Sequence, residues 1–144
     1  MTGMTFEARL KRYYALWREN NDIYAEWARK RGLSYFELLV TLSLAEGEQT
    51  QKRICDQWNL PKQTVHSILR AFQAKGWVEL EPLPADRRNK AVSLTAAGRE
   101  KALPVAAELT EHECRVWHAL GERACRALED GLARYAALFR EVEA

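Results

Sequence analysis

The chain has 144 residues, with 22 Lys and Arg against 20 Asp and Glu, and its formal net charge is +2 at pH 7. This length fits a single domain, because domains of about 100–200 residues are usual. No run of about 18 apolar residues occurs, so no transmembrane helix is expected, and the first residues lack the pattern of a signal peptide. The three cysteines have no disulfide-scaffold or CxxC spacing, which favours a reducing, cytoplasmic location.

The charge is unevenly distributed along the chain. Residues 51–90 carry eight basic and four acidic side chains, a net charge of +4, which leaves −2 for the rest of the chain. A basic centre between mildly acidic ends favours a local anionic partner. Ordinary surface charge would give the same pattern, so the charge alone does not decide between the two interpretations.

The first helix is predicted over residues 5–31. Aromatic and aliphatic side chains recur there at helical spacing, from Phe6 to Trp27. Basic residues followed by Gly32 are typical of a helix C-terminus, because cations interact favourably with the helix dipole and glycine readily takes the left-handed conformation. The segment therefore forms one long amphipathic helix.

A second helix is predicted from Ser34 to about Glu46. Ser34 and Glu37 have the spacing of a capping box, in which each side chain accepts the other residue's backbone N–H. The residues that follow are apolar almost all round, so this helix is expected to be buried. Residues 47–49 are expected to form a turn.

Residues 50–75 are predicted to form two helices joined by a tight turn. The first begins at Thr50, a suitable N-cap, and ends near Trp58. Asn59-Leu60-Pro61 forms the turn, and Pro61 is expected at the first position of the second helix, where its missing N–H is not needed. That helix extends to Lys75 and has an apolar stripe made of Val65, Ile68, Leu69 and Phe72.

After Gly76 the pattern changes to the period of a strand. Residues 77–81 and 91–94 are two short alternating runs on either side of a basic loop, which is typical of a β-hairpin. A helix-turn-helix followed by a basic hairpin is a winged helix-turn-helix. The predicted fold class is therefore mainly α with a small β-hairpin wing, whose winged part covers residues 34–95.

The C-terminal part is predicted to form two more helices. Thr95 is expected to cap a long helix to about Leu120, with a kink at Pro104. Gly121 separates it from a last helix that ends near Val142. The helices over 5–31 and 96–142 all need apolar partners, which favours a homodimer. An intramolecular three-helix bundle is the alternative.

The wing carries the most specific motif of the sequence. Gly76-Trp77-Val78, then Asp86-Arg87-Arg88, then Val92-Ser93-Leu94-Thr95-Ala96-Ala97-Gly98 resemble the wing signature of MarR-family transcriptional regulators. The resemblance extends over nearly the whole chain in length and helix order. It implies a DNA-binding homodimer, and a repressor that acts on a pseudo-palindromic operator.

Two groups of residues are candidates for contacts with double-stranded DNA. Polar and basic side chains on the second helix of the motif suit a major groove, and an arginine at a hairpin tip can enter a narrow minor groove. Asp86 is expected to shape the wing turn, since a carboxylate cannot favour phosphate. The candidates are Lys62, Gln63, Thr64, His66, Ser67 and Arg70 on the helix, and Arg87, Arg88 and Lys90 on the wing. A solvated helix face is the plainer interpretation.

Other functions are less well supported by the sequence. Cys114 and His118 have ligand-like spacing, but a structural zinc site needs four ligands, so neither a metal nor a cofactor is expected. No paired carboxylates, nucleophile and base, or phosphate-binding glycine loop indicate an enzyme.

The resemblance implies an effector cleft for a small phenolic or carboxylate ligand, lined by Tyr13, Trp17, Tyr24, Trp27 and Phe36. The rival function is a winged-helix protein-interaction module without specific DNA binding.

Overall fold

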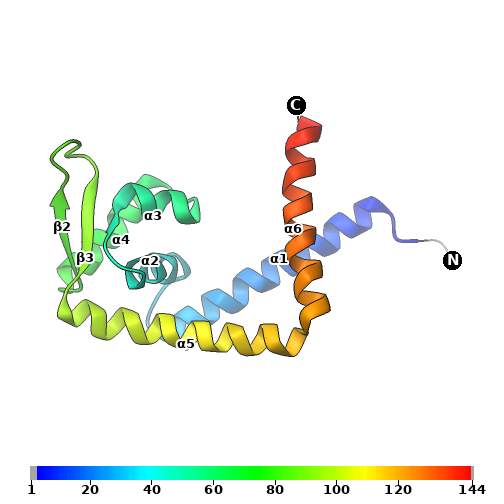
Figure 1. Ribbon diagram of the computed structural model, residues 1–144, viewed down its shortest axis with the longest axis horizontal. Helices are drawn as coiled ribbons and strands as arrows, with labels where there is room; N and C mark the ends of the chain where they lie inside the picture. The colour runs from blue at the N-terminus through cyan, green and yellow to red at the C-terminus, as the bar shows by residue number, and fades with distance from the viewer. Residues whose placement is uncertain (1–2, 144) are drawn as a thin grey trace. The chain divides into compact units, whose positions relative to one another are not determined.

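The computed structural model describes residues 3–143 and has the expected mainly α fold with a small β wing (Figure 1). The chain divides into two compact units, one that ends at Val105 and one that begins at Ala106, and the helix α5 runs through the boundary. The elements in order are α1 (Phe6–Arg29), α2 (Tyr35–Ala45), β1 (Gln49–Thr50), α3 (Gln51–Trp58), α4 (Lys62–Ala74), β2 (Val78–Pro82), β3 (Lys90–Leu94), α5 (Ala96–Leu120) and α6 (Glu122–Glu143).

The junction between α1 and α2 forms as the sequence predicts. Gly32 has a positive φ of 76°, and Leu33 N donates to Ala28 O over 3.0 Å, which closes the end of α1. The capping box of α2 is complete: Glu37 N donates to Ser34 Oγ over 3.2 Å, and Ser34 N donates to Glu37 Oε1 over 2.8 Å. These bonds satisfy backbone groups that a helix end otherwise leaves unpaired.

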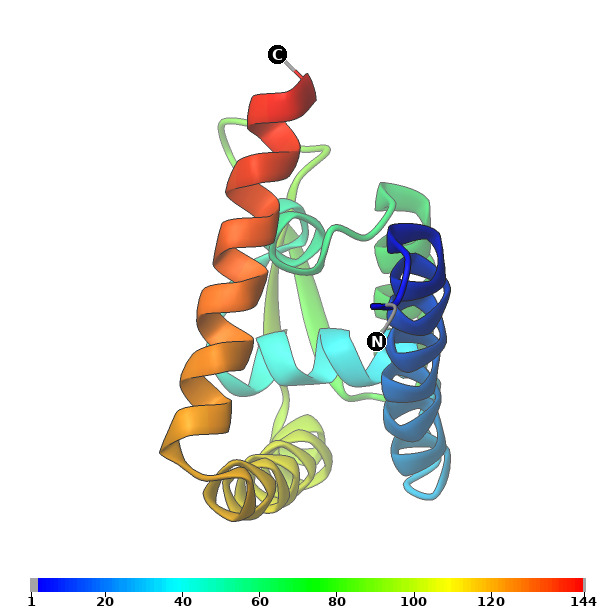
Figure 2. The same cartoon turned by 90° about the vertical axis from the view of Figure 1, so that its right-hand side faces the viewer.

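The core of the first unit lies among α2, α3, α4 and β3. Figure 2 shows α2 lying across the two long strands. Leu38, Leu39, Val40 and Leu44 of α2 are buried, as its apolar pattern predicts. The prediction that the whole helix is buried is wrong at Phe36, which is exposed, and Leu42 is only half-buried. The fully buried side chains at the centre are Leu38, Val40, Leu44, Ile54, Val65, Leu69 and Val92.

The sheet has three strands, in the order β1-β3-β2, where the sequence predicts only a hairpin. β2 and β3 pair antiparallel with Leu80 opposite Val92. The expected turn over 47–49 is wrong at its last residue, because Gln49 begins β1 and pairs with Val92. Two residues are too few for an alternating pattern, so this strand gives no periodic signal in the sequence.

The turn between α3 and α4 differs from the prediction in one detail. Asn59 takes the left-handed conformation with φ of 51° and ψ of 47°, as asparagine tolerates. Pro61 has an extended ψ of 142° and is the N-cap residue of α4, so its expected place at the first helical position is wrong. α4 therefore runs from Lys62 to Ala74, one residue shorter at each end than predicted.

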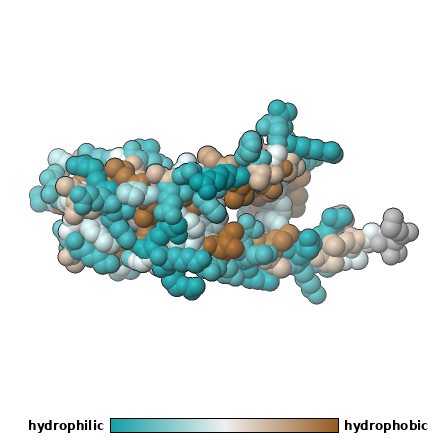
Figure 3. All heavy atoms as spheres, turned by 90° about the horizontal axis from the view of Figure 1, so that it is seen from below, coloured by the Kyte–Doolittle hydropathy of each residue, from teal (hydrophilic) through white to brown (hydrophobic). Residues whose placement is uncertain are grey.

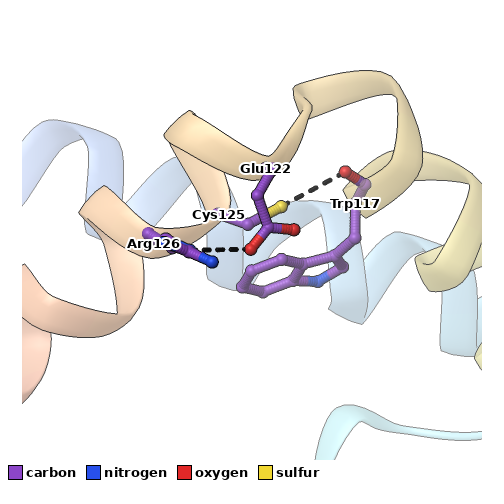
Figure 4. A network of polar contacts seen from close by, with 4 residues as sticks. All are labelled: Trp117, Glu122, Cys125 and Arg126. Atoms are coloured by element: carbon purple, nitrogen blue, oxygen red, sulfur yellow. Dashed lines mark hydrogen bonds and ion pairs between the residues drawn. The ribbon is translucent and has the colours of Figure 1, made fainter.

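α5 begins at the predicted cap, since Gly98 N donates to Thr95 Oγ1 over 3.0 Å. The helix continues through Pro104 to Leu120. Gly121, with φ of 84°, then separates it from α6, as predicted. At this elbow the Cys125 thiol donates to the Trp117 carbonyl at 3.2 Å, and Arg126 Nε donates to Glu122 Oε1 at 2.8 Å (Figure 4).

Two further findings concern residues 3–143. No helix in this part of the chain is long and apolar enough to cross a membrane. No three His, Cys, Asp or Glu side chains within the same range come together in a way that could hold a metal ion, so Cys114 and His118 gain no further ligands there.

Candidate nucleic-acid interface

The orientation of α4 is fixed by its apolar stripe. Val65, Leu69 and Phe72 are buried against the core, and Ile68 is half-buried beside them. The opposite face must therefore point to solvent, because side chains three and four residues apart share one side of a helix. Gln63, Ser67 and Arg70 are exposed on that face, and Lys62 is exposed in the first turn of the helix.

Two of the six predicted side chains of α4 lie at the edge of this exposed face. Thr64 and His66 are half-buried, whereas the other four are exposed. The four exposed side chains include two amide or hydroxyl groups and two cations. Such groups can hydrogen-bond to base edges in a major groove and to backbone phosphates.

The wing is shaped by Asp86. Its Oδ1 accepts the Arg88 backbone N–H at 3.1 Å, and its carbonyl accepts the Asn89 N–H at the same distance. Leu83 N donates in turn to Asn89 O over 3.2 Å and closes the loop. This is the turn-forming arrangement that the sequence suggests for Asp86, because an aspartate side chain can bond to the backbone two residues on.

The three basic residues of the wing differ in what their side chains contact. Lys90 Nζ donates to the Arg87 carbonyl at 3.0 Å, so this ammonium stabilises the wing backbone. Arg87 and Arg88 are exposed at the tip of the hairpin. The structure therefore places two guanidinium groups where they can reach a partner.

The wing and the helix-turn-helix together form an open hollow of about 350 Å³. Its walls include Arg88 from the wing and Lys62 from the start of α4. Three cations and two carboxylates line it, so it has a small positive excess. The full lining consists of Gln51, Lys52, Cys55, Asp56, Lys62, Asp86, Arg88 and Asn89.

The sequence did not predict five of the residues that line this hollow, and a hydrogen bond joins two of them. Lys52 N, in the first turn of α3, donates to Asn89 Oδ1 at 3.1 Å, although the two residues are 37 positions apart. Lys52 and Asn89 are polar residues without a periodic pattern, so only the fold shows that they meet. Nearby, burial raises the pKa of the Cys55 thiol, and the negative charge of Asp56 adds to the increase.

The aromatic residues predicted to line an effector cleft lie on α1 and α2. Tyr13, Trp17 and Phe36 are exposed, and Tyr24 and Trp27 are half-buried. The guanidinium carbon of Arg31 lies 3.5 Å from the centre of the Trp27 ring, so a cation covers this ring. The exposed rings of Trp17 and Phe36 are accessible to a ligand or to a second chain.

A polar helix face beside a basic wing defines a winged helix-turn-helix protein of the DNA-binding class. The model of the MarR family matches residues 32–89, which hold α2, the helix-turn-helix and most of the wing. No curated protein matches the sequence. The winged part of the chain therefore matches the MarR family model, and the full chain has the fold of MarR family transcriptional regulators.

Solved structures resemble nearly the whole chain. The MarR family regulator NMB1585 from Neisseria meningitidis is 28% identical, covers 96% of both chains and superposes with a TM-score of 0.79. Reduced AbfR bound to DNA is 22% identical, covers 92% of this chain and 95% of its own, and has a TM-score of 0.67. NadR in complex with 4-hydroxyphenylacetate is 20% identical, covers 94% of this chain and 98% of its own, and has a TM-score of 0.69. At these identities the likeness to AbfR and NadR shows the fold alone.

Proposed function

We propose that the protein binds a pseudo-palindromic operator as a homodimer and represses transcription from it. Each protomer inserts α4 into a major groove and its wing into the flanking minor groove. The observation that carries this proposal is that Lys62, Gln63, Ser67 and Arg70 are exposed while the other face of α4 is buried. The two-fold symmetry of a dimer then predicts half-sites about 10 bp apart, one turn of the duplex.

The wing supports the same mode of binding. Arg88 is exposed at the hairpin tip and shares a hollow with Lys62 of α4. Its guanidinium is suited to a narrow A·T-rich minor groove, where the potential is most negative. Arg87 and Lys52 are exposed nearby and suit backbone phosphates, whose contacts weaken as salt rises.

Exposed apolar side chains support the homodimer. Large hydrophobic side chains reach the surface of the molecule in Figure 3, and many of them belong to the N- and C-terminal helices. Phe6 of α1 is 83% exposed, and Phe139 of α6 is 61% exposed. α6 buries no residue in the described chain although its sequence is amphipathic. Apolar surface on this scale marks a protein interface, and a second copy of the chain covers it in the proposed dimer.

A small aromatic carboxylate or phenol is the proposed effector. The support is the set of aromatic side chains on α1 and α2, together with the 4-hydroxyphenylacetate complex of NadR, a protein of the same fold. The effector must bind one dimer geometry more tightly than the other, because a ligand shifts an equilibrium only by its differential affinity. If saturating phenols and aromatic carboxylates change neither Tm nor DNA affinity, this part of the proposal is wrong.

The test of DNA recognition is selection from a pool of random duplexes, followed by sequencing, at two salt concentrations. The proposal predicts enrichment of an inverted repeat whose half-sites are about one helical turn apart. Weak, unenriched binding that modest salt abolishes would indicate charge attraction only, and would favour a winged-helix module that binds a partner protein. Repression is then tested by transcription in vitro from a promoter that overlaps the enriched repeat.

A further inference from the structure

The bond between Asn89 and Lys52 joins the wing to the helix-turn-helix. Lys52 N is one of the first backbone N–H groups of α3, which have no partner within the helix. The helix's own cap, Thr50, accepts a different N–H, that of Arg53, at 3.1 Å. Asn89 therefore supplies from the wing an acceptor that the N-terminus of α3 would otherwise lack.

The backbone of Asn89 is itself fixed within the wing. Its N–H donates to the Asp86 carbonyl and its carbonyl accepts from Leu83 N, so the side chain starts from a rigid loop. Two residues further along, Ala91 pairs with Thr50 in the sheet. The side-chain bond therefore extends the contact between β1 and β3 beyond the end of the ladder, into the loop that carries Arg88.

Arg88 and Lys62 lie on the walls of one hollow, and Asn89 and Lys52 line it as well. The separation of the wing arginine from the start of α4 thus depends on how the loop is held against α3. A minor-groove arginine and a major-groove helix must fit one duplex at once. A loop that is free to move loses this fit, because ordering it on DNA then costs conformational entropy.

We propose that Asn89 is a positioning residue for DNA binding: it docks the wing on the N-terminus of α3 and so holds Arg88 at the distance from α4 that the duplex requires. The inference rests on the proposed function, since it concerns binding to the operator. Asn89 acts through Arg88 and needs no DNA contact of its own.

The test measures how much Arg88→Ala weakens binding to the enriched duplex in four backgrounds. These are the wild type, Asn89→Ala, Asn89→Asp and Thr50→Ala. Asn89→Asp keeps an acceptor oxygen, and a carboxylate suits a helix N-terminus. Thr50→Ala is the matched control, because it removes a cap bond from the same helix but leaves in place the backbone pairing of residue 50 with Ala91 and the bond between Asn89 and Lys52.

Arg88→Ala is expected to weaken binding to the enriched duplex about tenfold in the wild type, in Asn89→Asp and in Thr50→Ala. In the Asn89→Ala background the same substitution weakens binding less than about threefold, because Arg88 is then no longer held in position and the effects of the two substitutions do not add. The Tm of Asn89→Ala stays within about 5 °C of the wild type, as expected for one lost cap bond.

The proposal is overturned if Arg88→Ala has the same effect in Asn89→Ala as in the wild type, since Asn89 would then be merely structural. It is also overturned if Thr50→Ala reduces the factor as much as Asn89→Ala does. If the wild type does not prefer the enriched duplex to a scrambled one, the proposed function itself has failed. If the wild type binds specifically but the effects of Asn89→Ala and Arg88→Ala on affinity simply add, only the positioning role of Asn89 is rejected and the proposed function stands.

Discussion

Gly98, in the first turn of α5, lies directly against the backbone carbonyl of Trp77. A Cβ at position 98 would overlap the Trp77 oxygen and lie 2.8 Å from the carbonyl carbon. The same oxygen accepts the Thr95 N–H at 3.0 Å, and Thr95 Oγ1 donates to the Gly76 carbonyl at 2.5 Å. The start of α5 is thus held against the base of the wing by a contact that only glycine permits.

Gly98→Ala is therefore expected to destabilise the protein. The obstacle is backbone and cannot turn aside, so the helix start must shift, at a cost of about 2–3 kcal/mol. Gly131→Ala is the control, because position 131 lies within α6 and a Cβ there meets nothing within 4 Å. The control should gain about 0.5–1 kcal/mol. Urea unfolding of both variants at one protein concentration measures the two changes, and equal stabilities would contradict the close approach.

The proposed dimer predicts an effect of charge on α6. Leu132 and Phe139 are each 61% exposed and lie on the same stripe of the helix. Phe139→Asp should convert the dimer to monomer at micromolar concentration, because a buried unpaired carboxylate is strongly unfavourable. Ala133→Asp adds the same charge to another face of the helix. Sedimentation equilibrium should find this control dimeric, and a dimeric Phe139→Asp would show that α6 is not at the interface.

Two neighbouring side chains at the start of α4 should have different effects on DNA binding. Lys62→Ala is expected to weaken binding to all duplexes alike and to lower the salt slope by about one, as for a lost phosphate contact. Gln63→Ala is expected to relax the preference at one base pair of each half-site by about 1–3 kcal/mol. Binding to the enriched duplex and its single-base variants over a salt series separates them. Identical effects from both substitutions would contradict this division.

Cys55 should react slowly in the folded protein. Burial, together with Asp56, raises the pKa of its thiol, so folding favours the protonated form. The contribution to stability is complete below the unfolded pKa and is lost as pH rises through the folded pKa. Alkylation at pH 8 should therefore be slower in the native protein than in urea, because the thiolate is the nucleophile.

Cys114 is the internal reference for this measurement, because it is exposed in the chain. Mass spectrometry of peptides should find Cys114 alkylated before Cys55 in the native protein. Faster labelling of Cys55 than of Cys114 would contradict the assigned burial.

Much of the fold could be predicted because its signals are local. The capping box of Ser34 and Glu37 and the stripe through Val65 and Leu69 depend on spacing within one helix, and the structure contains both. β1 could not be predicted, because two residues carry no period and become a strand only by pairing with β3. The place of Pro61 was missed by one position, since its fixed φ suits the N-cap and the first helical position equally.

The candidate site was predictable in its residue types but not in its internal contacts. The sequence pattern identifies Arg88 as a wing residue and Gly98 as part of the motif. It does not reveal that Asn89 meets Lys52, or that Gly98 faces Trp77, because both contacts join distant segments. The assignment of DNA contacts to particular side chains stays a prediction.

The most direct test of specific recognition is the affinity of the wild type for the enriched duplex and for a scrambled duplex of equal length, over a range of salt concentrations. We predict a preference of about 10³ or more at physiological salt, which is typical of specific DNA-binding proteins. Both affinities should fall as salt rises, because phosphate contacts contribute to each. A ratio near one at every salt concentration would contradict sequence-specific binding.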